Sequence, residues 1–449
     1  MVEEHGHNFN AVQIATAWVA LCKMPSAGEG KGGGGGVLQR LLQVLTRGKV
    51  QEMGARQVAN VVHSIAKLHA GARTGFPGQL MGELQAHATA TAGDFNPQDV
   101  SQLLWALAKM GIKQTDAGLL RAMQGRARET AGDFKAQEVA STMWALAGMG
   151  IRLDAGLLEA MQGRATATAR DFKPQEVANL MRSLAKMGIE NPDAGLLKAM
   201  QGRARETAGD FKPEEVSNTI WALATMGITP DAGLLEAMQG RARTTAGDFL
   251  PQHVASLMRS LAKMGIENPD AGLLKAMQGR FVESAGDFKP PEVANTMWAL
   301  AKMGITPDAG LVEAMQRRAT ATAHNFRSRE LANTMWALAQ MGITPDAGLL
   351  EAMQKRATAT VRDFGSQEVA NTMGALAKMG ITPDAGLVEA MQKRATARAG
   401  KFKPEEVLML MSALEKMGIT PDAGLVEAMQ GRGVSNTPLG VPDTGDPRS

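Results

Sequence analysis

The pattern FxPxEVxNTMWALAxMGITPDAGLLEAMQxR returns every 38 or 39 residues along most of this 449-residue chain. Nine clear copies each open at a phenylalanine: Phe95, Phe134, Phe172, Phe211, Phe249, Phe288, Phe326, Phe364 and Phe402. Two weaker copies precede them, one opening at Phe9 and one at Met53. A fixed period of this size is typical of a stack of small units in which each unit contacts only its neighbours. It argues against a globular domain built around one catalytic pocket.

The copy at residues 210–247 carries the start and stop signals of two helices. Pro213 suits the first turn of a helix, apolar residues then recur at helical spacing, and Gly227 supplies a C-terminal cap. The triplet Thr229-Pro230-Asp231 indicates a second start, with the threonine hydroxyl as the capping group. We therefore predict an all-α fold, a right-handed α-solenoid of about eleven helix-turn-helix repeats, with the first helix of each repeat on the concave surface.

The repeat pattern also divides the chain. Residues 1–94 hold two degenerate repeats with a glycine-rich insertion at 28–36, and residues 95–432 hold nine regular repeats. Residues 433–449, rich in glycine, proline and polar residues, are expected to form a disordered tail. The recurring phenylalanine should plug the space between neighbouring units, and the methionines should pack in the core.

Composition narrows the function without choosing it. The net charge of +3 and the pI near 8.9 do not by themselves argue for nucleic acid. The single cysteine, Cys22, excludes a disulfide or a cysteine-based zinc site within the chain. His5 and His7 have no further ligand nearby, and no apolar run reaches the roughly 18 residues that span a membrane. Since no catalytic set or nucleotide motif emerges, we expect no enzyme activity, cofactor, metal or small-molecule substrate.

The first helix of each repeat, helix A, departs from a simple core-and-solvent pattern. At about 100° per residue, the positions 5, 8, 9, 12 and 15 after the phenylalanine form the core stripe. The positions 3, 7, 10 and 14 after it form the opposite stripe, and mostly Ala or Ser lies between the two at 6, 11 and 13. Because small flanking residues let neighbouring A helices approach closely, the opposite stripe should line one continuous surface.

Three columns of this stripe form the candidate site. Seven residues after the phenylalanine stand Asn60, Gln102, Ser141, Asn179, Asn218, Ser256, Asn295, Asn333 and Asn371. Ten residues after it stand His63, Trp105, Trp144, Arg182, Trp221, Arg259, Trp298 and Trp336. Fourteen residues after it stand Lys23, Lys67, Lys109, Lys186, Lys263, Lys302, Lys378 and Lys416.

These residue types suit single-stranded nucleic acid. Trp, Arg and His each have a flat face that can stack on a base. Asn and Gln present both a donor and an acceptor to a base edge, and Lys supplies a charge for phosphate. A purely structural interpretation stands beside this one, in which Trp wedges between A helices, Asn braces them as a ladder, and Lys tips are solvated.

If each repeat reads one nucleotide, the residues at positions 7 and 10 should select it. The pairs Asn218/Trp221, Asn295/Trp298 and Asn333/Trp336 are the same and should prefer the same base. The pairs Asn179/Arg182 and Ser256/Arg259 should prefer another, because Arg offers a fork of donors that Trp lacks.

A further column of arginines recurs late in the second helix of the repeat, helix B. Its members are Arg126, Arg164, Arg203, Arg241, Arg280, Arg318, Arg356 and Arg394. They could favour the C-terminus of helix B through its dipole, or they could extend a basic rim. The sequence leaves both interpretations open.

The unit resembles the octotricopeptide repeat family, organellar α-solenoid proteins that are numerous in green algae. The resemblance lies in the proline before helix A, the (N/S)TxWALAxMG segment and the PDxxLLxA start of helix B. It covers residues 95–432 well and 9–94 loosely. It implies binding of specific single-stranded RNA, in the chloroplast or alternatively the mitochondrion, and control of the stability, processing, splicing or translation of one transcript.

The resemblance also implies partners among RNA-processing or translation proteins. The N-terminal segment MVEEHGHNF lacks the Arg- and Ser-rich, acid-poor character of a transit peptide. The chain ends shortly after the last repeat, and nothing in it matches the C-terminal RAP domain that some members carry.

Two other functions stay open. A protein-interaction scaffold of the HEAT or TPR kind would use the same surface as a peptide groove. Modular DNA binding in the manner of TAL effector repeats would need a glycine-rich loop between the helices, whereas the corresponding segment here is MGITPD. Sequence-selective binding of single-stranded RNA is the first interpretation.

Overall fold

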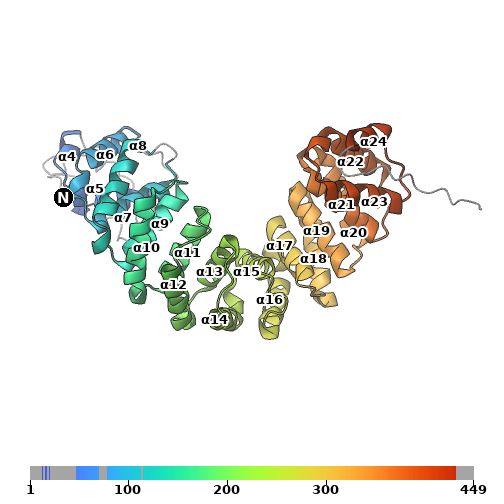
Figure 1. The fold of residues 1–449 in the computed structure, drawn as a ribbon, viewed down its shortest axis with the longest axis horizontal. Helices are drawn as coiled ribbons and strands as arrows, with labels where there is room; N and C mark the ends of the chain where they lie inside the picture. The colour runs from blue at the N-terminus through green and yellow to red at the C-terminus, as the bar shows by residue number, and fades with distance from the viewer. Residues whose placement is uncertain are drawn as a thin grey trace, which may run out of the picture. The chain divides into compact units, whose positions relative to one another are not determined.

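The computed structural model describes residues 47–69, 78–112 and 115–430, together with Gln13, Thr16, Ala17 and Ala20. These residues form helices with short connections and no strand. They fall into two compact units, one ending at Arg241 and the other beginning at Ala242 (Figure 1). Within each unit, consecutive helices pair into hairpins that pack on the next hairpin along the chain. The α-solenoid prediction is thus confirmed, and the handedness of the superhelix stays a prediction.

Unit 1 contains two rows of helices. The A row consists of α5 (Ala55–His69), α7 (Pro97–Met110), α9 (Ala136–Gly148), α11 (Pro174–Lys186) and α13 (Pro213–Met226). The B row consists of α6 (Gly78–Ala90), α8 (Ala117–Glu129), α10 (Ala155–Ala167), α12 (Ala194–Glu206) and α14 (Ala232–Thr244), in which the unit ends. The short helix α4 (Arg47–Gln51) packs against α6.

Unit 2 repeats this arrangement. Its A row consists of α15 (Pro251–Lys263), α17 (Pro290–Lys302), α19 (Ser328–Met341), α21 (Ser366–Lys378) and α23 (Pro404–Lys416). Its B row consists of α16 (Ala271–Glu283), α18 (Ala309–Thr322), α20 (Ala347–Ala359), α22 (Ala385–Arg398) and α24 (Ala423–Met429). In both units, adjacent A helices pack over more of their length than adjacent B helices do.

Helix A begins and ends as its sequence signals predict. In α11, Pro174 is the first residue, and the Glu176 carboxylate accepts a hydrogen bond from the Lys173 backbone N–H at 2.9 Å. At the other end, Gly188 adopts a φ of 72°, which a residue with a Cβ rarely does. The Ile189 N–H then donates to the Leu184 carbonyl at 3.0 Å, which closes a Schellman motif.

Helix B begins differently from the prediction. The capping group is the aspartate and not the preceding threonine: the Asp231 carboxylate accepts from the Leu234 N–H at 2.8 Å. Pro230 lies before the capping residue and therefore does not belong to the first helical turn. Because the N-cap side chain must reach the third N–H of the helix, only the residue immediately before Ala232 is placed to do so.

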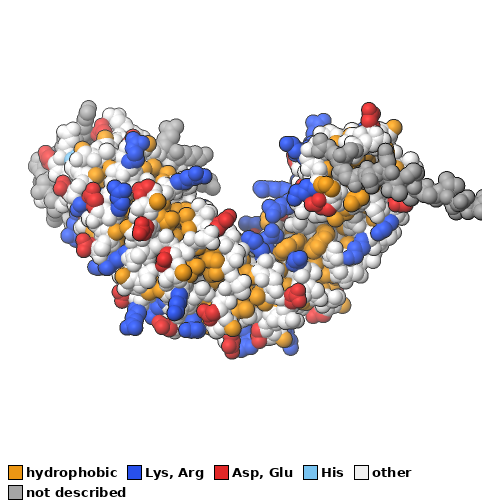
Figure 2. Space-filling view, in the orientation of Figure 1, with side chains coloured by type: hydrophobic (Ala, Val, Ile, Leu, Met, Phe, Trp, Pro, Cys, Tyr) orange, Lys and Arg blue, Asp and Glu red, His pale blue; other side chains and the backbone are white. Residues whose placement is uncertain are grey.

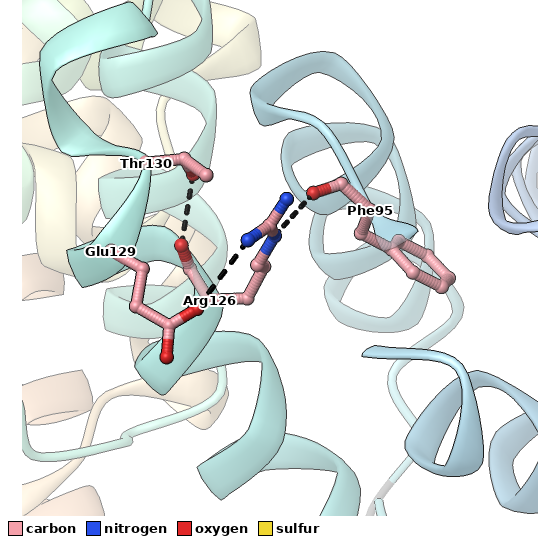
Figure 3. A network of polar contacts seen from close by, with 4 residues as sticks. All are labelled: Phe95, Arg126, Glu129 and Thr130. Atoms are coloured by element: carbon pink, nitrogen blue, oxygen red, sulfur yellow. Dashed lines mark hydrogen bonds and ion pairs between the residues drawn. The ribbon is translucent and has the colours of Figure 1, made fainter. Parts of the chain in front are cut away.

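The phenylalanine that opens each repeat anchors its hairpin twice. The ring is fully buried in the repeats from Phe95 to Phe364, as the sequence predicted. Its backbone carbonyl accepts a hydrogen bond from Nε of the late helix-B arginine, at 2.7 Å for Arg126 (Figure 3). The same bond joins Arg164 to Phe134, Arg203 to Phe172, Arg241 to Phe211, Arg280 to Phe249, Arg318 to Phe288, Arg356 to Phe326 and Arg394 to Phe364. These arginines therefore close the hairpin by joining the end of helix B to the start of helix A.

Neighbouring B helices are joined by a glutamine that the sequence analysis did not single out. The Gln162 side chain in α10 accepts a hydrogen bond from the Asp193 backbone N–H, at 2.8 Å, just before α12. Corresponding bonds join Gln85 to Asp116, Gln201 to Asp231, Gln316 to Asp346, Gln354 to Asp384 and Gln392 to Asp422. Each such bond sets the next helix B against the previous one.

Several predictions fall outside the described residues. They concern most of the repeat at Phe9, the glycine-rich insertion at 28–36, the tail at 433–449, and the residues Lys23, Cys22, His5 and His7. Most methionines in the middle of the regular helices are buried as predicted, for example Met143, Met181, Met200 and Met353, whereas Met409 of α23 is 41% exposed.

The hydrogen bond between the late helix-B arginine and the phenylalanine carbonyl predicts that two neighbouring arginines contribute very differently to stability. Arg203→Met should lower the local stability of α11 and α12 by about 1–3 kcal/mol, because the buried Phe172 carbonyl loses its donor. The matched control Arg205→Met removes an exposed ion pair with Asp231 at 3.7 Å and should cost about 0–1 kcal/mol. Amide hydrogen exchange measures the stability change in both variants. Equal changes would contradict the role of Arg203 in closing the hairpin.

Candidate nucleic-acid interface

The three predicted columns lie together on the A helices of each unit, and we call this surface the A face. All described residues of the column at position 7 are half-buried, and all described lysines at position 14 are exposed. The flat side chains at position 10 are half-buried, apart from the exposed Arg182. Trp105, Trp221 and Trp298 are therefore partly accessible, as a stacking role requires.

The flat side chains of unit 1 contact one another from helix to helix. The ring centroids of His63 and Trp105 are 4.8 Å apart, and those of Trp105 and Trp144 are 6.5 Å apart. Farther along, the guanidinium carbon of Arg182 lies 5.8 Å from the centroid of the Trp221 ring. In unit 1, flat side chains of adjacent A helices therefore lie beside one another from His63 to Trp144 and again from Arg182 to Trp221.

Unit 2 shows the same arrangement over three repeats. Arg259 lies 4.8 Å from the centroid of the Trp298 ring, and the Trp298 and Trp336 centroids are 6.5 Å apart. The series stops at Trp336, because Gly374 and Ser412 occupy position 10 in the next two repeats.

The arginines of this column bind the polar column of the following repeat. Arg182 Nη1 donates to Asn218 Oδ1 at 3.0 Å, and Arg259 Nη1 donates to Asn295 Oδ1 at 2.8 Å. Burial lowers the pKa of Arg259 from its ordinary value. Arg thus replaces Trp as a flat group on the next ring, which gives the Trp-to-Arg exchange a structural cause.

This finding changes the pairing expected from the sequence. The sequence analysis paired Arg182 with Asn179 of its own repeat, whereas the structure pairs it with Asn218 of the next repeat. The long Arg side chain reaches across because small residues keep neighbouring A helices close. Bracing by Asn is therefore present at Asn218 and Asn295.

The other amides of the polar column are not used in this way. The side chains of Asn60, Gln102, Asn179, Asn333 and Asn371 form no hydrogen bond with any described residue. Each leaves a donor and an acceptor free at the half-buried edge of the A face. Recognition of bases by these residues stays a prediction.

The A face carries an excess of positive charge that the net charge of the chain conceals. None of its described lysines forms an ion pair with a described residue, and Lys378 Nζ only donates to Gln340 Oε1 at 2.6 Å. At position 3 of the stripe, Glu214 and Glu405 are the only acids among the described repeats. Figure 2 shows Lys and Arg side chains gathered beside hydrophobic ones around α17 and α19 of unit 2.

Neither a metal site nor a membrane-spanning helix is found among the described residues. They contain no group of three His, Cys, Asp or Glu side chains placed to hold a metal ion. None of the described helices combines the length and apolar character needed to cross a bilayer.

A family model described as RNA-editing substrate-binding complex 6 protein matches residues 37–308 and 292–440. The chain belongs to this family. Comparison of the chain with curated protein sequences finds no match.

Three solved or assembled structures resemble this member of the family weakly. Yeast Rmd9p in complex with a 16-nucleotide target RNA is 10% identical, covers 94% of this chain and 96% of its own, and has a TM-score of 0.37. A homology model of the full-length AP-3 complex in an intermediate open conformation is 11% identical and has a TM-score of 0.40. The alignment covers 93% of this chain and 80% of the AP-3 chain. Kap121p bound to Ste12p is 9% identical and has a TM-score of 0.30. The alignment covers 93% of this chain and 47% of Kap121p.

The contact between Arg259 and Trp298 can be tested by a double-mutant cycle. Arg259→Met and Trp298→Leu should show a coupling free energy of about 0.5–2 kcal/mol in urea unfolding, because a partly desolvated guanidinium packs on the indole. The pair Lys355→Met and Trp298→Leu, whose side chains lie on helices of different rows, serves as the control. Zero coupling would mean that Arg259 is free of the ring in solution.

The histidine at the start of the series should make unit 1 sensitive to acid. Burial, together with the nearby Lys67, lowers the pKa of His63 from 6.5 to about 4. Between these two values the unfolded chain binds a proton that the folded chain does not, so stability falls as the pH falls through this window. The protection factors of amides in α5 and α7, corrected for the intrinsic pH dependence of exchange, should therefore fall from about pH 7 to about pH 5.

The variant His63→Phe should remove this part of the pH dependence while it keeps a ring beside Trp105. If the variant and the parent chain respond equally to pH, His63 does not have the lowered pKa.

Proposed function

We propose that this chain binds single-stranded RNA along the A face. The observation that carries the proposal is the series of half-buried flat side chains bordered by exposed lysines without carboxylate partners. Rings that are held on one side by the next helix offer an edge or face to an unpaired base at little cost in conformational entropy. The lysines beside them lie where the phosphates of such a strand would run.

The name of the matched family supports an RNA partner, since it refers to an RNA-editing substrate-binding complex. The resemblance to octotricopeptide repeats supports the same class of partner. On these two grounds we propose a role in the post-transcriptional control of an organellar transcript, through its processing, stability or translation. The proposed compartment is the chloroplast, or alternatively the mitochondrion, and the proposed role is binding and not catalysis.

Sequence selectivity is proposed to arise across repeat boundaries. Where Arg182 or Arg259 occupies the amide oxygen of the next Asn, that Asn is left with its NH₂ group as a free donor. Asn333, by contrast, keeps both its donor and its acceptor. The repeats of Asn218 and Asn295 should therefore prefer bases that present an acceptor. The repeat of Asn333 should differ from them, because its amide can both donate and accept.

The lysines give the most direct test. Lys263→Gln, Lys302→Gln and Lys416→Gln together should weaken binding of unstructured RNA and reduce the log–log salt slope by about 2, at about 0.7 for each lost phosphate contact. The control combines Lys198→Gln, Lys275→Gln and Lys355→Gln, which are exposed on B helices and remove the same charge. Fluorescence anisotropy with labelled single-stranded and duplex RNA measures the effect.

Equal losses in the two triple variants would mean that only bulk charge binds RNA and would overturn the A face as the interface. No binding of RNA by the parent chain would reject the proposed function and favour the protein scaffold. Tighter binding of duplex than of single strand would contradict the stacking mechanism.

A further inference from the structure

The series of flat side chains stops where the A face of unit 2 opens into a groove. Five described repeats carry Trp at position 10, but the repeat of α21 carries Gly374 there. Between α19, α21 and α23 lies a groove of about 420 Å³, lined by Trp336, Asn371, Gly374, Lys378, Met409 and Lys416 among others. Where other repeats place an indole or a guanidinium, Gly374 has no side chain, and Met409 of α23 lies against it at the edge of the groove.

The walls of this groove suit a planar apolar group. Trp336, the last ring of the series, lies at one side of the groove and is half-buried. On the other side, Met409 is 41% exposed, and its Cγ would lie 3.1 Å from a Cβ placed at Gly374. An exposed methionine beside an indole is an adaptable surface, and both groups favour an aromatic ring between them.

The rim of the groove carries polar groups that such a ring could use. The Asn371 amide forms no hydrogen bond with a described residue, so its donor and acceptor are both free. Lys416 has no ion-pair partner among the described residues, and Lys378 is bound to the neutral Gln340. The lining contains no Asp or Glu. A planar group with a hydrogen-bonding edge and a linked negative charge satisfies all of these groups together.

We propose that this groove holds one unpaired base of the bound RNA. The base stacks on Trp336, the Asn371 amide hydrogen-bonds to its edge, and Lys416 and Lys378 contact its flanking phosphates. This inference rests on the proposed function. It adds a position at which a base enters a groove and does not lie along the edges of the flat side chains at position 10. An acidic peptide could contact the same lysines, but it would have no need of the groove beside Trp336.

The substitution Gly374→Trp tests this proposal, because it restores the residue that other repeats carry at this position. The new side chain should fill the groove, with the flexible end of Met409 moving aside. RNA selected from a random pool by the parent chain and by the variant should differ at one position, which the variant no longer specifies. Affinity for the RNA selected by the parent should fall about tenfold, as expected for one lost base stack.

Gly279→Trp is the matched control, because Gly279 lies exposed on helix α16 and a Cβ added there would meet nothing within 4 Å. A second variant, Asn371→Ala, leaves Gly374 in place and removes a side chain that makes no hydrogen bond with a described residue. It should lose discrimination at the same RNA position as Gly374→Trp does. Circular dichroism confirms that each variant is folded.

The outcomes separate the two proposals. If the parent chain selects RNA and both variants select the same sequence with unchanged affinity, the groove is not a base site while RNA binding stands. If the parent chain selects no RNA, both proposals fail. If Gly374→Trp weakens an acidic peptide but no RNA, the groove belongs to a protein partner and this inference is overturned.

Discussion

The close packing of adjacent A helices is the constraint on which the candidate site depends. It is possible because the positions that flank the core stripe carry small side chains, such as Ala178, Ser183 and Ala185 in α11, which are at most 6% exposed. At this separation an indole on one helix reaches the next indole, and an arginine reaches both the next ring and the next amide. Larger flanking residues would separate the helices and leave these groups in solvent.

The same contacts stabilise the stack and shape its surface. A Trp ring that packs against its neighbour contributes to the interface between repeats, and its remaining exposed part is held in one orientation. A binding surface of this kind loses little conformational freedom when a ligand arrives, which favours affinity. The structural and the functional interpretations of the flat column are therefore compatible, since a repeat array has only its inter-repeat contacts from which to build a continuous surface.

Basic side chains have different partners on the A helices and on the B helices. On the B helices, arginines are satisfied within the fold: Arg203 closes its hairpin on a phenylalanine carbonyl, and Arg205 pairs with Asp231 at the start of the next helix B. On the A helices, the lysines are left without carboxylate partners among the described residues. A nearly neutral chain thus presents one surface with a local positive potential, which attracts a polyanion without a strongly basic composition.

The sequence by itself determined the repeat, its two helices and the face that each residue occupies, because helical periodicity and glycine caps are local signals. It also placed the three columns on one surface. The roles of particular side chains depended on the tertiary structure, since they involve residues about 30 to 40 positions apart in the chain. Arg126 closes its hairpin on the Phe95 carbonyl, and Arg182 binds Asn218 of the next repeat. The periodicity of a single helix cannot reveal such contacts, because they depend on how far apart and in what register two separate helices pack.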